Sequence, residues 1–164
     1  MGYIPIIYFI IKELSHIMNI YIILAFTAGL LLALQVGVNA TVANSIQSSY
    51  MAVLLSFSVG TLSLIAYALT SKQTFFISMS HMQNIPWWGW SGGLLGAAYV
   101  TLAIVSAPQV GAAQMVAFIV TGQLLTSLIL DHFGLVGFEV NQINLYRVIG
   151  AIFLITGVFL IRKS

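Results

Sequence analysis

The sequence contains very little charge. Its 164 residues include five Lys or Arg and three Asp or Glu, which is 5% of the chain, whereas a typical soluble domain has ~25%. Residues 14–71 and 73–130 contain no Asp, Glu, Lys or Arg at all. Because a water-soluble surface needs roughly 25–35% charged residues, we expect most of the surface of this chain to face lipid.

Several residue patterns that carry chemistry are also absent. Cysteine does not occur, which excludes disulfides. The residues His16, His81 and His132 lie far apart without a pairing motif, so we predict no metal site. No nucleophile–His–acid arrangement is visible, and we predict neither catalytic activity nor a cofactor. The basic residues are scattered at helix ends and form no patch, so binding of nucleic acid is not predicted.

What the sequence has in abundance is apolar residues, which make up 60% of the chain at a mean hydropathy of +1.07. One spanning helix needs ~20 apolar residues, so each long uncharged run accommodates two helices and a turn. We predict an all-α, polytopic membrane bundle with five transmembrane helices, at about residues 19–38, 50–70, 86–106, 110–130 and 147–161. The connections are too short to form a separate aqueous domain.

The first residues differ from the rest. Tyr3–Ile11 is apolar but too short to span a bilayer, and Pro5 interrupts it. Charges follow this run, which is the wrong order for a signal peptide. We therefore divide the chain into a non-spanning extension, 1–17, and a five-helix domain, 18–164. The extension is either sequence upstream of a true start at Met18 or a short interfacial segment.

The basic residues give only a weak orientation signal. On the predicted topology, one side of the membrane carries Lys12, Lys72 and Arg147, and the other carries Arg162 and Lys163. Positive residues favour the cytoplasmic side, and here the two sides differ by one. Without the extension the two counts are equal. Two interpretations stay open: a weak bias that still fixes one orientation, or insertion in both orientations.

Small residues recur at a spacing of four in two of the predicted helices. They are Ala25, Gly29, Ala33 and Gly37 in the first helix, and the overlapping pairs Gly89–Gly93 and Gly92–Gly96 in the third. Such stripes let helix backbones approach closely in a membrane. They predict close helix contacts, either within one chain or between chains.

Polar side chains inside the predicted spans are more informative, since they are costly against lipid. Gln35 and Asn39 share a face of the first helix, Ser56 lies in the second, and Gln123 and Ser127 share a face of the fourth. One interpretation is a polar path for a solute that is lined by these residues. The other is interhelical hydrogen bonding that serves packing alone.

Asp131 is the acidic residue at the end of a predicted span, and His132 follows it. Such a pair can relay protons or bind a cation, which makes both residues candidates for coupling. The alternative is an ordinary solvated helix end.

Taken in order, four segments resemble the YdcZ-like family of the drug/metabolite transporter superfamily. They are 28–40 (AGLLLALQVGVNA), 56–62 (SFSVGTL), 86–97 (PWWGWSGGLLGA), and 122–124 (GQL) with 131–134 (DHFG). The resemblance extends from about Met18 to Arg162, which is nearly the whole chain. Each motif alone is weak, but their order is specific.

The resemblance implies a five-helix half-unit. Larger members of the superfamily have ten helices in two inverted repeats, so a half-length chain is expected to pair with an oppositely oriented copy or paralogue. Inverted repeats place the solute site near the bilayer midplane at the repeat interface. Gln35, Asn39 and Gln123 fall on polar motif positions of the family. Small multidrug exporters of the superfamily use a Glu in their first helix, which is absent here, so proton-coupled export of cationic drugs is not predicted.

The predicted function is therefore transport, in the direction of export, of a small solute across a bacterial-type inner membrane. The expected form is an antiparallel dimer with the substrate path at the dimer interface. The alternative is a non-transporting membrane subunit that binds or stabilises a partner protein. A polar cavity at mid-depth would favour transport, and a closed, dry interface would favour the alternative.

Overall fold

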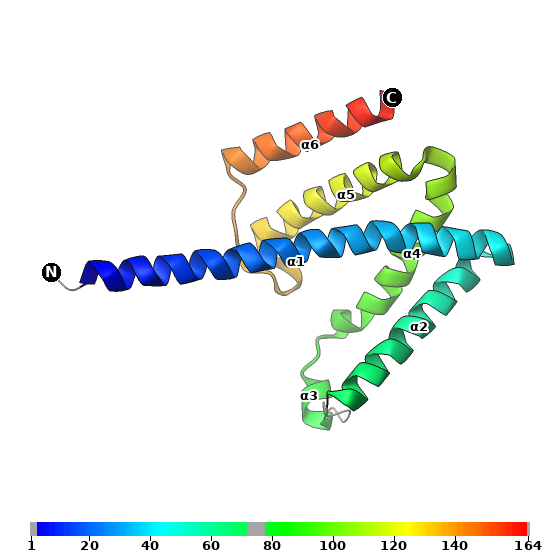
Figure 1. The fold of residues 1–164 in the computed structure, drawn as a ribbon, viewed down its shortest axis with the longest axis horizontal. Coiled ribbons are helices and arrows are strands. Elements are labelled where there is room, and N and C mark those ends of the chain that lie inside the picture. The colour runs from blue at the N-terminus through cyan, green and yellow to red at the C-terminus, as the bar shows by residue number, and fades with distance from the viewer. Residues whose placement is uncertain (1–2, 72–77, 164) are drawn as a thin grey trace.

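The computed structural model describes the backbone of residues 3–71 and 78–163, and the side chains of residues 18–71 and 78–163. All regular structure in this part is helical (Figure 1). The elements are α1 (Tyr3–Ile46), α2 (Ser49–Thr70), α3 (Met79–Gln83), the 3-10 turn η1 (Trp87–Ser91), α4 (Gly92–Val110), α5 (Ala112–Phe133), the 3-10 turn η2 (Leu135–Gly137) and α6 (Leu145–Lys163).

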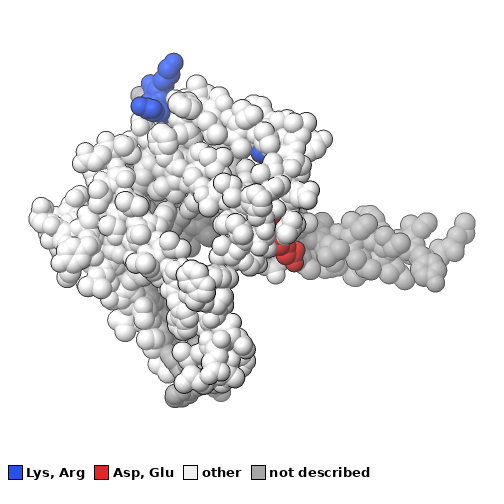
Figure 2. Space-filling view, turned by 180° about the vertical axis from the view of Figure 1, so that it is seen from behind, with Lys and Arg blue, Asp and Glu red and all other residues white. Residues whose placement is uncertain are grey.

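Five segments of the described chain are long and apolar enough to cross a membrane, which confirms the predicted fold class. They are Met18–Ile46, Ser49–Thr70, Trp87–Val110, Ala112–Phe133 and Leu145–Lys163. The described residues on the face of the molecule in Figure 2 show only small patches of Lys, Arg, Asp and Glu atoms. Five successive crossings place the start of α1 and the end of α6 on opposite sides of the membrane.

The first spanning helix is longer than predicted. We expected it to end at about Val38, but α1 continues to Ile46. The Thr41 hydroxyl donates to the Gly37 carbonyl at 3.0 Å, and the Ser45 hydroxyl donates to the Thr41 carbonyl at 2.9 Å. Polar residues that hydrogen-bond back to the preceding turn need not end a helix, which is why this polar stretch was wrongly taken as the boundary.

The third spanning helix also extends slightly past its predicted end, which lies near Ser106, Ala107 and Pro108. Pro108 lies inside α4 and has no N–H, so the Ile104 carbonyl loses its usual helical donor. The helix nevertheless continues to Val110. It ends at Gly111, whose φ of 84° is a conformation that residues with a Cβ rarely adopt.

Residues 3–17 continue α1 without a break in the backbone. A helix of 44 residues is ~66 Å long, about twice the ~30 Å hydrocarbon thickness of a bilayer. Figure 1 shows the N-terminal end of α1 extending past the other helices. The side chains of residues 1–17 are outside the described part, and the division of the chain at Met18 stays a prediction.

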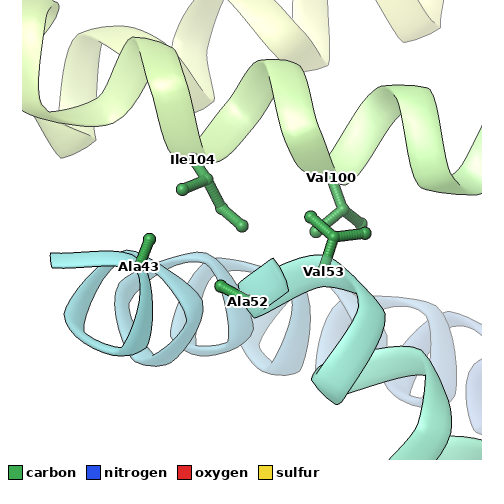
Figure 3. Close-up of a cluster of buried hydrophobic side chains, with 5 residues drawn as sticks. All are labelled: Ala43, Ala52, Val53, Val100 and Ile104. Atoms are coloured by element: carbon green, nitrogen blue, oxygen red, sulfur yellow. The ribbon is translucent and has the colours of Figure 1, made fainter. Parts of the chain in front are cut away.

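The main packing centre joins α1, α2 and α4. Ala43 of α1, Ala52 and Val53 of α2, and Val100 and Ile104 of α4 form one buried cluster, in which the side chains of α4 point toward the α1–α2 junction (Figure 3). Its two alanines, Ala43 and Ala52, belong to the small residues that let membrane helices approach closely.

A second cluster links this centre to α5. Val36 of α1, Ala103 of α4 and Met115 of α5 are buried together. In α6 the buried residues are Ala151 and Val158, and the extensive contacts of this helix are with α5. The molecule thus consists of an α1–α2–α4 centre with an α5–α6 pair attached through α4 and α1.

Candidate functional site

Asn39 is the one buried polar side chain of the described part. It is 4% exposed, and its Nδ2 has no hydrogen-bond partner among the described residues. It lies on the face of α1 that carries the buried Val36 and Ala43, between the two clusters that pack against α4. An unsatisfied buried donor costs roughly 1–3 kcal/mol, so this amide is poised to donate to an acceptor that the described residues do not supply.

The other predicted path residues are more open. Gln35, Gln123 and Ser127 are exposed and Ser56 is half-buried. No hydrogen bond of the described residues joins any two of the five, and Gln123 on α5 is not brought to Asn39 on α1. The single chain thus presents these groups on outer helix faces. The prediction that they share a polar cavity concerns the assembly and stays a prediction.

Most of the glycines that were predicted to pack helices together have open space beside them in the described part of the chain. A Cβ added at four of them would meet nothing within 4 Å: Gly29, Gly37, Gly92 and Gly93. At Gly96 it would lie 3.4 Å from Cζ of Phe57 of α2, an ordinary van der Waals contact across the α2–α4 packing. At Gly89 it would lie 3.0 Å from Cγ2 of the sequence neighbour Ile85. Apart from Gly96, these glycines do not pack against another helix of the described part.

Asp131 forms an ion pair that the sequence analysis missed. Nη2 of Arg147, at the start of α6, donates to its Oδ2 at 3.1 Å, with both side chains about a quarter exposed. Nη1 of Arg147 donates to the Asn141 carbonyl at 3.0 Å, and the Asn141 N–H donates to the Asp131 carbonyl at 2.8 Å. The signal was available: two opposite charges at the two ends of one connection, in a chain with few charges.

His132 is engaged in the same connection. Its Nδ1 accepts the N–H of Ile143 at 3.2 Å, and its ring meets that of Phe133 edge-to-face with centroids 4.7 Å apart. An Nδ1 that accepts belongs to a neutral ring with its proton on Nε2. Asp131 and His132 therefore hold the α5–α6 connection together, and their role in coupling stays a prediction.

A polar pocket lies where α1 ends, α2 begins and α4 ends. Its volume is about 320 Å³, and its polar lining residues are Asn44, Gln47, Ser48, Ser49 and Gln109. Ala43 and Ile104, both from the main buried cluster, are among the apolar residues that complete it. The sequence analysis took residues 41–49 as a helix end and so missed this pocket. The signal was the run of amides and hydroxyls at that end.

A second pocket, also of about 320 Å³, lies between α4 and α5. Apolar side chains dominate its lining, and the hydroxyls of Tyr99 and Ser106 are the polar groups there. It offers few partners for a hydrogen-bonding solute, so the polar pocket is the better candidate for recognition.

Comparison with known proteins places the chain in a family. Residues 20–160 match the family described as "Putative inner membrane exporter, YdcZ". This chain belongs to the YdcZ family. The Escherichia coli (strain K12) protein named "Inner membrane protein YdcZ" is 30% identical over 148 residues, which is 89% of this chain and 98% of that protein. No solved structure matches the chain.

Membership of the YdcZ family bears on the predicted localisation and on the predicted class of activity. The relative is an inner membrane protein and the chain has five segments able to span a bilayer, so it is an integral protein of the inner membrane. The family description is that of a membrane exporter rather than an enzyme. The predicted resemblance to the YdcZ-like family is thereby confirmed.

Proposed function

We propose that this protein exports a small solute as an antiparallel pair of five-helix chains, with the substrate path at their interface. The family description supports the class of activity. The observation that best supports the pairing is the large exposed surface area of the single chain. It exposes 13103 Å², whereas a compact protein of 17.8 kDa exposes about 8,000 Å².

The exposed amides support the same arrangement. Gln35 and Gln123 lie on spanning helices and face outward in the single chain. Against lipid each would leave several hydrogen-bonding groups unsatisfied. A second chain related by a two-fold axis in the membrane plane would cover these faces and enclose a polar path at mid-depth.

The open glycine stripe of α1 supports close approach of the second chain. Gly29 and Gly37 have nothing within 4 Å of an added Cβ, so another helix backbone can come near at these positions. The partner is a second copy, or a paralogue inserted the other way. The small difference in basic residues between the two sides, three against two, favours a second copy.

Charge addition combined with flux measurement tests this proposal. One variant carries two extra Lys after Lys163, and the other carries two beside Lys72, a residue outside the described part. Each should adopt a single orientation, opposite to that of the other variant, as read by reporter fusions to the C-terminus. Solutes for flux in liposomes would be chosen by thermal stabilisation of the purified protein across a metabolite and ion panel.

Each variant alone should lose flux, and co-expression of the two should restore it. A native protein with one orientation and full flux in the absence of a paralogue would refute the antiparallel pair. One orientation with a requirement for a paralogue would establish the pair as a heterodimer. A dry, closed interface without flux would instead favour a subunit that binds a partner protein.

A further inference from the structure

We propose that the polar pocket binds an uncharged solute with several hydroxyl groups, such as a polyol or a sugar, and forms a mouth of the transport path. The second part of this statement rests on the proposed transport function. The first part, the chemistry of the ligand, rests on the pocket alone.

The pocket offers hydrogen bonds from three segments of the chain. Asn44 and Gln47 come from the end of α1, Ser49 from the start of α2, and Gln109 from the end of α4. Asn44 and Gln109 each supply donors and an acceptor. Gln47 keeps its side-chain carbonyl and one N–H, because its Nε2 already donates to the Asn44 carbonyl at 2.6 Å, and the Ser48 hydroxyl already accepts the Met51 N–H at 3.4 Å. The remaining donors and acceptors around one space match a molecule that carries many hydroxyl groups, because each hydroxyl also donates and accepts.

The pocket has no partner for a charge. Its lining contains no Asp, Glu, Lys, Arg or His, and the charge-free runs 14–71 and 73–130 include every lining residue. An ion that left water here would lose hydration without gaining a counter-charge, which is unfavourable. A neutral polar solute has no such penalty. The volume of about 320 Å³ is at the small end of the range of ligand sites, about 300–1,000 Å³.

The pocket lies directly before the buried amide. Ala43 and Ile104 line it and also belong to the buried α1–α4 packing. Asn39 is one helical turn deeper than Ala43 on the same face of α1, with Nδ2 unpartnered. Pro108, which also lines the pocket, deprives the Ile104 carbonyl of its helical donor. A small separation of α1 from α4 would therefore lead a solute from the pocket to a donor.

The antiparallel arrangement determines where the pockets of the two copies would lie. One copy would open its pocket at one face of the membrane, and the inverted copy would open an identical pocket at the other face. The path would then have the same set of amide and hydroxyl groups at its entrance and at its exit.

Cysteine labelling tests the ligand class, because the chain contains no cysteine. The reporter is Ser49→Cys in the pocket, and the control is Ala112→Cys, which also occupies the first residue of a helix and does not line the pocket. The purified full chain in detergent is labelled with a membrane-impermeant maleimide. The neutral probes are erythritol, xylitol and sorbitol. Gluconate and N-methylglucamine are the charged counterparts of sorbitol.

At least one neutral probe should slow labelling of Ser49→Cys, by roughly tenfold at ten times its Kd. Gluconate and N-methylglucamine should leave the rate unchanged, and no probe should affect Ala112→Cys. Equal slowing by neutral and charged probes, or no slowing by any neutral probe, would overturn the proposal.

A second variant separates binding from folding. Gln47 has a φ of 54°, which glycine adopts more easily, so Gln47→Gly removes an amide without straining the turn. In the Ser49→Cys background it should raise the concentration of the protecting neutral probe that gives half-protection by roughly three- to tenfold. Unchanged protection would exclude Gln47 as a ligand and contradict the assigned site. Protection without flux in liposomes would retain the binding site and refute transport. Flux without protection would support transport and refute the binding site.

Discussion

The α1–α2–α4 centre and the α5–α6 pair are held together in different ways. The centre is packed through small buried side chains such as Ala52 and Val100. In the pair, a polar network of Asp131, Arg147 and Asn141 closes the connection between the helices. The centre thus encloses an amide, Asn39, whose Nδ2 has no partner among the described residues, while the pair presents an amide, Gln123, on its outside. The comparison indicates that one region provides the scaffold and the other provides an open polar face.

The largest effect on flux is expected from a substitution on the exposed face of α5. Gln123→Leu removes a donor and an acceptor at nearly constant volume, so it should reduce flux to background while the folded yield stays near normal. Flux in liposomes and the yield of monodisperse protein measure the two quantities. Val120→Leu, also exposed on α5, is the control and should retain flux. A collapse of yield in Gln123→Leu would mean that this amide serves packing.

Asn39→Leu applies the same change inside the centre. It should also abolish flux, but here the free energy of unfolding should rise, by about 1 kcal/mol, because the unsatisfied donor disappears. Thermal unfolding in detergent measures this difference. A less stable Asn39→Leu protein would show that the amide has a structural partner in the assembly.

Overpacking should distinguish the scaffold from the lipid-facing surface. Ala52 is 1% exposed where α1, α2 and α4 meet, so Ala52→Leu should lower the free energy of unfolding by roughly 1–3 kcal/mol. Ala66→Leu, on an exposed position of the same helix, should have little effect. Equal destabilisation by both substitutions would mean that the centre is not the scaffold.

The smallest effect is expected from the connection of the pair. Asp131→Asn breaks a partly exposed ion pair and should lower the free energy of unfolding by no more than about 1 kcal/mol. The exchange Asp131→Arg with Arg147→Asp should recover part of that loss. The same variant tests the predicted role in coupling. Unchanged pH dependence of flux would remove Asp131 from the mechanism, and a changed pH profile would support its role.

The number and approximate location of the spans could be predicted from the sequence, because about 20 consecutive apolar residues have few other uses. The face of each helix that packs against other helices could not be predicted from the sequence. A helix that is apolar on every side carries no contrast between its lipid face and its packed face. Gln35 and Asn39 therefore looked equivalent in the sequence, although one is exposed and the other is buried against α4.

The polar interactions of the α5–α6 connection were not predicted, for a different reason. The Asp131–Arg147 pair depends on how η2 (Leu135–Gly137) turns the chain back, with Gly134 and Gly137 at positive φ. Val136 adopts φ 57° there as well, which sequence propensity does not favour. The ion pair could be proposed from charge position alone, but its geometry depends on this turn.

The five crossings have a consequence for the history of such chains. An odd number of spans leaves the chain on the side opposite to its start. Two such sequences joined end to start in one gene would therefore insert the second unit upside down, without an additional connecting helix. An even number of spans would give two parallel units instead. The two-fold arrangement proposed here for separate chains could thus become covalent through a single tandem duplication.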